Sequence, residues 1–295
     1  MGRRSWANVR YSSKADMFRA DLLKGKKILV TGGGTGLGKS IARRYLELGA
    51  ELVICGRRTA VLDAAATELA GETGGRVATV QCDVRDADQV ESMMRQIWER
   101  GPLDVLVNNA AANFIARTEK LSPRAIDAVL NIVLHGSFYC TVACGQRWIE
   151  AQRAGTVLSV ATTPSFTGSA FTAPSAAAKA GIVAMTRSLA VEWGPKGIRL
   201  NAVAPGLFPT PGAWERLYPP GSQVEPQEAN VPLRRVGEHI ELANLFAYLA
   251  SDEAGYITGD LVVIDGGRWM QGVGGPSARA MHDWTDEQWE AMRKR

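Results

Sequence analysis

Residues 26–38 read KKILVTGGGTGLG, and this stretch decides the fold. Its apolar run ILV is typical of a buried strand, and the glycines that follow end the strand in a tight turn. Residues 39–50, KSIARRYLELGA, have helical spacing, so the turn leads from a strand into a helix. The spacing of Gly32, Gly36 and Gly38 lets a phosphate approach the backbone at the N-terminus of that helix. The stretch therefore predicts a strand–turn–helix unit that binds a dinucleotide.

The same alternation of strand and helix continues along the chain. Strands are predicted at 26–31, 51–56, 76–84, 103–109, 155–162, 198–206 and 261–267. Helical spacing between them predicts two long helices at 124–152 and 174–193 and a shorter one at 239–251. Strands that are apolar throughout and alternate with helices are typical of a parallel sheet covered on both faces. The predicted class is α/β, a single doubly wound parallel sheet of seven strands (Rossmann).

The domain organisation follows from this pattern. We expect an N-terminal arm at residues 1–22, one dinucleotide-binding and catalytic domain at 23–270, and a C-terminal tail with a short helix at 271–295. Residues 207–235 are rich in Pro and Gly and follow the sixth strand. Ligands bind at the carboxyl ends of parallel strands, so this segment is predicted to form a small lid.

Composition excludes several classes of function. The 295 residues are 46% hydrophobic and 22% charged, with a net charge of +4 and no basic block, so nucleic acid is not an expected partner. No apolar run approaches the ~18 residues of a membrane span, so no membrane is expected. The four cysteines form no C-x-x-C or metal-like cluster, so no metal is expected and a bacterial-like, reducing cytoplasm is favoured. The alternative compartment is the mitochondrial matrix. Asp16 and Asp21 argue against a mitochondrial transit segment, because such segments contain few acidic residues.

The end of the second predicted strand indicates which dinucleotide is bound. Folds that prefer NAD usually carry an acid there, whereas this chain reads CGRR, with Arg57 and Arg58. A guanidinium fork suits a 2′-phosphate, so NADP(H) is the predicted cofactor. The alternative is that both arginines face solvent at the start of a helix.

Several further motifs have a family resemblance. The chain resembles the short-chain dehydrogenase/reductase family in TGGGTGLG, CDV, NNAA, the lysine of APSAAAKAG (residues 173–181), NAVAPG and DGG. Within that family it is most similar to the mitochondrial type of 2,4-dienoyl-CoA reductase, through stretches such as NNAAANFI, GAWERL and ELANLFAYLASDEA.

The resemblance implies an enzyme that uses NADPH to reduce a 2,4-dienoyl-CoA thioester of fatty-acid metabolism to a 3-enoyl-CoA, as a homotetramer. The implied cofactor residues are Thr31, Gly32, Gly34, Thr35, Gly36, Leu37, Gly38, Arg57, Arg58, Asp83, Val84, Asn109, Ala110, Lys179, Pro205, Gly206, Leu207 and Phe208. The implied acyl-CoA residues are Arg85, Asn113, Phe114, Ser122 and Arg216. The catalytic candidates are Lys179, Ser175, Asn113 and Thr162. Lys179 is expected at the cofactor ribose, at the edge of the pocket and outside the packed core.

The proton donor is the point at which the resemblance fails. The mitochondrial type uses a tyrosine fifteen residues before the lysine, and this chain has Pro164 there. The peroxisomal type uses an aspartate at a position that aligns with Val133. We favour a water held by Asn113. The other candidates are Ser175, Thr162, Ser165 and His135.

Two alternatives to this function remain open. The chain could act on another carbonyl or enoyl substrate, since a lost tyrosine fits a changed reaction. It could also bind a nucleotide without catalysis, because a fold does not imply a function. The acyl chain length is not predicted. The expected homotetramer rests on the resemblance alone, which also allows a homodimer.

Overall fold

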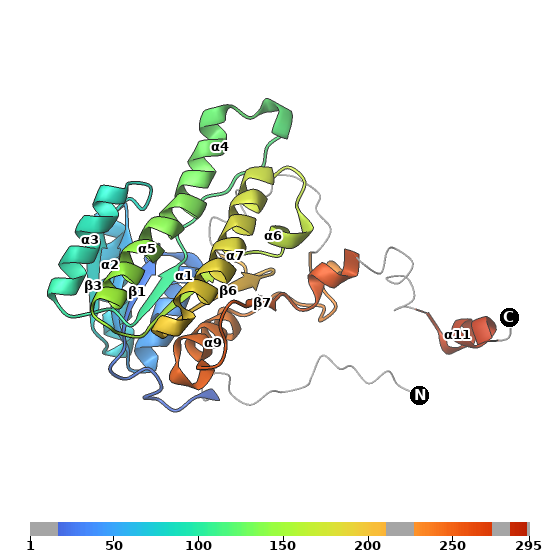
Figure 1. Ribbon diagram of the computed structural model, residues 1–295. Helices are drawn as coiled ribbons and strands as arrows, with labels where there is room; N and C mark the ends of the chain where they lie inside the picture. The colour runs from blue at the N-terminus through green and yellow to red at the C-terminus, as the bar shows by residue number, and fades with distance from the viewer. Residues whose placement is uncertain (1–16, 211–226, 273–283, 294–295) are drawn as a thin grey trace.

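The computed structural model describes residues 17–210, 227–272 and 284–293. A seven-stranded sheet forms its centre, in the order β3-β2-β1-β4-β5-β6-β7, and every neighbouring pair is parallel (Figure 1). The strands are β1 (Lys27–Thr31), β2 (Glu51–Gly56), β3 (Val77–Gln81), β4 (Val105–Asn108), β5 (Gly155–Val160), β6 (Ile198–Pro205) and β7 (Leu261–Ile264). The order reverses between β1 and β4. The prediction of a doubly wound parallel sheet is therefore confirmed.

Helices cover both faces of the sheet. The α-helices are α1 (Gly36–Glu47), α2 (Thr59–Thr73), α3 (Ala87–Glu99), α4 (Pro123–Leu130), α5 (Gly136–Glu150), α6 (Pro164–Thr167), α7 (Ala173–Trp193), α9 (His239–Ala250) and α11 (Asp286–Arg293). The short 3-10 turns are η3 (Thr118–Lys120), η5 (Gly194–Lys196), η6 (Gln227–Asn230), η7 (Asp252–Ala254) and η8 (Arg268–Gly272).

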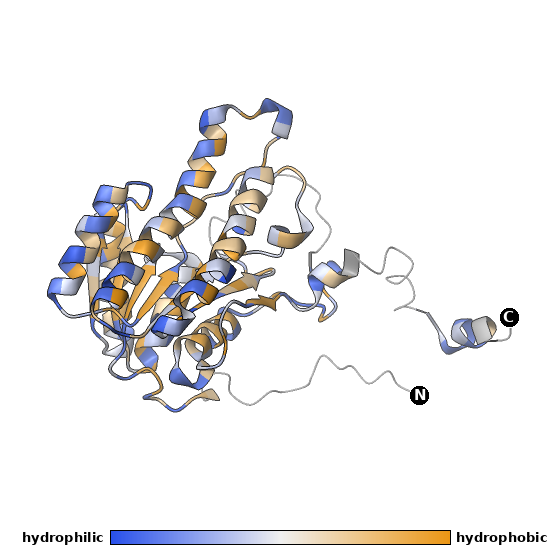
Figure 2. Cartoon of the chain, viewed as in Figure 1, coloured by the Kyte–Doolittle hydropathy of each residue, from blue (hydrophilic) through white to orange (hydrophobic). Residues whose placement is uncertain are grey.

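The core is split into two layers by the sheet, because side chains alternate along each strand. Ile28 and Val30 of β1 pack with α1, α2 and α9 on one face, and Leu29 packs with α3, α5 and α7 on the other. Figure 2 shows the consequence, apolar strands enclosed by helices whose outer surfaces are polar. A sheet buried on both faces needs the continuous apolar strands that the sequence shows.

The predicted helix at 124–152 differs from expectation in its middle. A π-helical turn, η4 (Asn131–His135), joins α4 to α5. The whole stretch Pro123–Glu150 is long and apolar enough to cross a membrane, which the sequence reading missed. Half of its most apolar window is buried in the fold, as in a core helix of an α/β protein. π turns occur often at functional sites, and this one lies beside the pocket described below.

The proposed domain boundaries remain predictions. Residues 1–16 of the arm, 211–226 of the lid and 273–283 of the tail lie outside the described residues. Arg216, predicted to bind substrate, lies there as well. Of the tail, the structure describes α11.

Candidate active site

A pocket of about 560 Å³ opens at the carboxyl ends of the central strands. It is lined by Gly32, Gly34, Thr35, Leu37, Cys55, Gly56, Arg57, Arg58, Val61, Leu62, Cys82, Asp83, Val84, Asn109, Ala110, Ala111, Ile132, Val160, Thr162, Phe208 and Thr210. The pocket lies where the strand order reverses, which is where open α/β sheets bind their ligands.

Hydrogen bonds from the residues that follow β4 hold the glycine loop in place. Thr31 Oγ1 accepts hydrogen bonds from the backbone N–H groups of Asn109 and Ala110, both at 3.0 Å. The Asn109 amide donates in turn to the Thr31 and Gly32 carbonyls, at 2.9 and 3.2 Å. A Cβ on Gly38 would come within 2.4 Å of that amide, so only glycine fits there.

The same loop leaves room for a pyrophosphate. Gly36 has a φ of 56°, which glycine adopts at no steric cost. A Cβ built on Gly36 would meet nothing closer than Thr210 at 3.6 Å, so the space above the N-terminus of α1 is open. Free N–H groups and the helix dipole attract phosphate at such a terminus. The residues present therefore fit a dinucleotide.

Arg57 and Arg58 line the pocket and are both exposed, at the start of α2. Asp83 lines the pocket after β3, and its ion pair with Arg85 was not foreseen. The Arg85 guanidinium donates to both Asp83 carboxylate oxygens, from Nε to Oδ1 at 2.9 Å and from Nη2 to Oδ2 at 2.5 Å. This contact lowers the pKa of Asp83 and raises that of Arg85. Arg85, predicted to bind substrate, is thus held beside a predicted cofactor residue and does not line the pocket itself.

Lys179 does not lie where we expected it. We predicted it at the pocket edge, outside the packed core, whereas only 6% of the residue is exposed. Its ammonium group donates to the carbonyl of Val160, a pocket residue at the end of β5. Burial lowers the pKa of Lys179 to about 8, because the charged form is poorly solvated there. Its charge is therefore sensitive to pH close to neutrality.

This pKa leads to a pH prediction. The protonated form of Lys179 predominates below pH 8, so its attraction for an anionic cofactor is lost as pH rises through about 8. We expect the affinity for NADPH to fall over that range, and the Lys179→Met variant to lack the fall. Fluorescence titration of NADPH from neutral to alkaline pH measures both. A fall of the same size in Lys179→Met would assign it to another group.

The candidates for the proton donor differ in where they lie relative to the pocket. Thr162 lines the pocket, and Pro164 is the first residue of α6. Ser165 Oγ is buried and makes no hydrogen bond in the part of the chain that the structure describes. Ser175 is half-buried in the first turn of α7, one turn before Lys179. His135 is exposed and its Nδ1 lies 2.8 Å from Asn131 Oδ1, so it is engaged away from the pocket.

The predicted acyl-CoA residues are only partly brought together. Asn113 is exposed, and its Oδ1 accepts from the N–H of Phe114 at 2.9 Å. Among the described residues its amide nitrogen has no partner, so two donors remain available. Phe114 packs on Val129, Val133 and Ala178. Ser122 instead caps α4, where its hydroxyl accepts from Ala125 N–H, and it is not part of the pocket wall.

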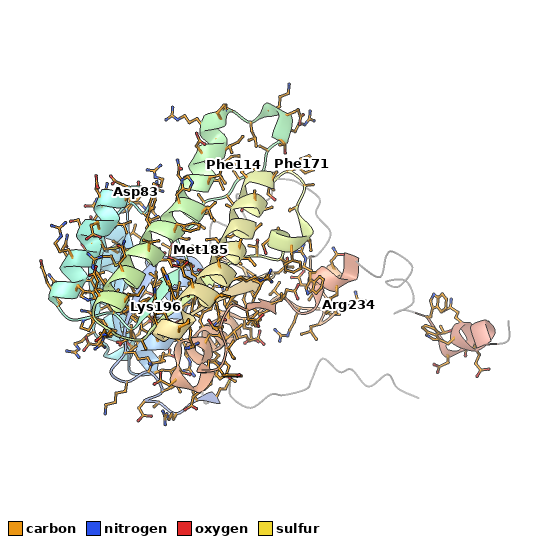
Figure 3. The ribbon with its side chains drawn as sticks, in the orientation of Figure 1. Asp83, Phe114, Phe171, Met185, Lys196 and Arg234 are labelled. Atoms are coloured by element: carbon orange, nitrogen blue, oxygen red, sulfur yellow. The ribbon has the colours of Figure 1, made fainter. Side chains whose placement is uncertain are left out.

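An apolar rim borders this region. The Ala116 N–H donates to the Phe171 carbonyl at 3.0 Å, so the segment after Asn113 runs beside the loop before α7 (Figure 3). Phe171 has a φ of 63°, a rare conformation for a bulky residue, and 58% of the residue is exposed. Ile115 is also exposed. Strained residues cluster at ligand sites, and this one lies beside the segment that follows Asn113.

After β6, the structure separates the predicted cofactor residues. Phe208 lines the pocket. Pro205 and Gly206 do not line it and belong to the backbone that leads into this segment. The Gly206 N–H donates to the Ile264 carbonyl at 2.9 Å, and a Cβ on Gly206 would come within 2.5 Å of Asp265. Leu207 lines a smaller cavity of about 120 Å³ on the other side of Phe208.

Sequence reasoning missed several pocket residues, namely Cys55, Gly56, Val61, Leu62, Cys82, Ala111, Ile132, Val160 and Thr210. Cys55 and Cys82 lie at the carboxyl ends of the neighbouring strands β2 and β3. That position was the signal from which their place in the pocket could have been predicted. Burial raises the pKa of Cys82 to about 11, so this thiol stays protonated. Ile132 reaches the pocket from the π-helical turn, which no sequence pattern had indicated.

Several known proteins are similar to this chain in sequence, and one of them also in fold. A family model described as enoyl-(acyl carrier protein) reductase matches residues 32–268. A probable 2,4-dienoyl-CoA reductase of Bacillus subtilis is 42% identical over 83% of this chain and 97% of its own length. The peroxisomal 2,4-dienoyl-CoA reductase of Danio rerio is 35% identical over 86% of this chain and 85% of its own. A crystal structure of a short chain dehydrogenase from Bacillus anthracis has a TM-score of 0.75 and 42% identity, and covers 83% of this chain and 96% of that one.

The class of protein follows from three features, namely the doubly wound sheet, the glycine loop where the strand order reverses, and the buried lysine. They are those of a nucleotide-dependent oxidoreductase. With the family match and these relatives, the chain belongs to the short-chain dehydrogenase/reductase family. Members of this family use nicotinamide cofactors, and the relatives from Bacillus subtilis and Danio rerio are named as a probable and a peroxisomal 2,4-dienoyl-CoA reductase.

Proposed function

We propose that the protein is an NADPH-dependent reductase of an unsaturated acyl-CoA, with 2,4-dienoyl-CoA thioesters as substrates. The observation that carries this proposal is the pairing of Lys179 and Ser175 on α7 at a site where Pro164 stands in place of a tyrosine. Ketone reduction forms an alkoxide, a strong base that needs an acid at once. Conjugate reduction of a dienoyl thioester forms a dienolate, a far weaker base that an ordered water can protonate.

The residues of the chain would divide the work as follows. The bound cofactor supplies a hydride. The glycine loop would hold its pyrophosphate, Arg57 and Arg58 its 2′-phosphate, and Lys179 its ribose. The free amide of Asn113 would hold the thioester oxygen and a water beside it, where negative charge develops. The apolar rim of Phe171 and Ile115 supports an acyl chain as the neighbouring part of the substrate.

The position of the proton distinguishes two products. Protonation of the dienolate next to the thioester leaves a 3-enoyl-CoA, and protonation two carbons further along leaves a 2-enoyl-CoA. The Bacillus subtilis relative is named as (2E)-enoyl-CoA-producing and that of Danio rerio as (3E)-enoyl-CoA-producing. We propose the 3-enoyl product here.

The test is NADPH oxidation with a 2,4-dienoyl-CoA, a 2-enoyl-CoA and a set of ketones, followed by product analysis. We expect the dienoyl thioester to be reduced fastest. Faster reduction of a ketone would favour another carbonyl substrate. Tight NADPH binding without turnover of any substrate would favour a nucleotide-binding protein that does not catalyse.

Cofactor choice provides a second test. The double change Arg57→Ala and Arg58→Ala removes the fork for the 2′-phosphate and leaves the glycine loop intact. We expect NADPH binding to weaken by about 1–3 kcal/mol, roughly 5- to 150-fold, with little change for NADH. Fluorescence titration with each cofactor measures this. Arg153→Ala is the control, since Arg153 precedes β5 at the opposite end of the sheet. Equal weakening toward both cofactors would refute the assignment.

The exposed apolar surface and the cysteines support proposals for assembly and compartment. We propose a homotetramer, supported by the exposed apolar side chains of Phe138 and Val142 on α5 and Val191 on α7. We also propose a reducing, cytoplasm-like compartment. All four cysteines are free and buried, which suits such a compartment.

A further inference from the structure

Residues 207–210, the segment after β6, are held in place by hydrogen bonds to residues just before and at the start of α9. Phe208 and Thr210 point into the large pocket. The carbonyls of the residues that alternate with them bond to the start of α9. The Gly237 N–H donates to the Leu207 carbonyl at 2.8 Å, and His239 Nε2 lies 2.6 Å from the Pro209 carbonyl oxygen. This part of the pocket wall therefore rests on residues 237–239.

The contacts of His239 define its tautomer. A carbonyl oxygen only accepts hydrogen bonds, so Nε2 must carry the hydrogen that it donates to Pro209. In the neutral ring, Nδ1 is then an acceptor. Ser40 Oγ lies 2.7 Å from Nδ1 and 3.3 Å from the Gly36 carbonyl oxygen, so the Ser40 hydroxyl donates to the nearer acceptor, Nδ1. Ser40 lies one turn into α1, which begins at Gly36 of the glycine loop.

One close contact limits the freedom of this segment. A Cβ on Gly237 would come within 2.4 Å of the Phe208 ring, so this ring lies directly on the glycine. On the other side, Thr210 borders the open space above Gly36, 3.6 Å from where a Cβ would be. His239 thus joins three parts of the chain, namely α1, α9 and the segment that carries Phe208 and Thr210.

We propose that His239, oriented by Ser40, is a positioning residue that holds Phe208 and Thr210 in the wall of the cofactor pocket. Neither His239 nor Ser40 lines that pocket, so each acts through the segment it supports. The inference rests on the proposed function, in that the pocket must take a nicotinamide dinucleotide. It adds a determinant of cofactor affinity that lies outside the glycine loop and the arginine pair.

Two substitutions of similar size separate the two bonds of His239. A glutamine amide can reach the position of Nε2 and donate to Pro209, whereas an asparagine amide reaches only as far as Nδ1 and Ser40. We expect His239→Gln to bind NADPH within about twofold of wild type. We expect His239→Asn and His239→Ala to bind it about three- to tenfold more weakly, the effect of one lost hydrogen bond. Fluorescence titration measures the dissociation constants, and thermal unfolding is recorded for each variant.

Ser40→Ala is the second probe, and it serves if a His239 variant does not fold. It removes the bond that orients the ring and retains the bond to Pro209, as His239→Gln does, so we expect a loss of NADPH affinity of about twofold and smaller than that of His239→Ala. His239→Asn binding as tightly as wild type would overturn the inference, as would equal losses in His239→Gln and His239→Asn. A wild-type protein that binds neither NADPH nor NADH would overturn the proposed function itself, and the inference with it.

Discussion

Replacement of Lys179 by methionine is expected to lower turnover by about 10²- to 10⁴-fold, because Lys179 would hold the cofactor ribose and its positive charge would assist the neighbouring proton donor. Methionine fills the space of the buried side chain and removes its ammonium group, which donates to the Val160 carbonyl. We expect the fold to survive, because the change removes a charge from a buried position. NADPH oxidation with a dienoyl-CoA measures the rate, and circular dichroism measures the fold.

Lys196→Met is the matched control. Lys196 is exposed on the 3-10 turn after α7, at the far end of that helix from Lys179, and Figure 3 shows it low in the molecule. We expect this variant to keep the wild-type rate. If Lys179→Met also keeps most of its rate, the active site is not at the end of β5, and the proposed function loses its main support.

Asn113→Ala is expected to lower turnover by about 10²- to 10³-fold, the usual effect of removing one donor to a developing oxyanion. In the structure, the Asn113 oxygen is occupied by the Phe114 N–H and its amide nitrogen is available to substrate or water. Asn113→Asp separates these two roles, because aspartate can still accept from Phe114 but offers no donor. We expect Asn113→Asp to be as slow as Asn113→Ala, and Ser175→Ala to lose less.

Another side chain would be the proton source if this expectation fails. Ser165 Oγ is buried without a partner among the described residues, Ser175 lies one turn before Lys179, and His135 carries an imidazole ring. An Asn113→Ala enzyme at full rate, beside an inactive Ser165→Ala, Ser175→Ala or His135→Ala enzyme, would end the water hypothesis. Such a result would leave the cofactor assignment intact, since none of these changes alters the glycine loop or the arginine pair.

Much of the fold could be predicted because its signals are local. The apolar runs and the glycines between them predicted all seven strands and the doubly wound sheet. The glycine loop was predictable for the same reason, since a turn with a positive φ at Gly36 and no room at Gly38 requires these residues in this order. Arg57 and Arg58 were placed at the pocket because they follow directly on a strand.

The tertiary structure alone decided how deeply the site residues are buried and what they contact. Lys179 meets the Val160 carbonyl, and the solvation that sets its pKa depends on the atoms packed around it. Ser40 and His239 meet across 199 positions of sequence, a distance over which no periodicity or motif carries information. Local patterns thus determined which elements form and where each strand ends. Burial and long-range contacts, which exist only after the chain has folded, decided which side chains reach the pocket, which ones support it and which carry their charge near neutral pH.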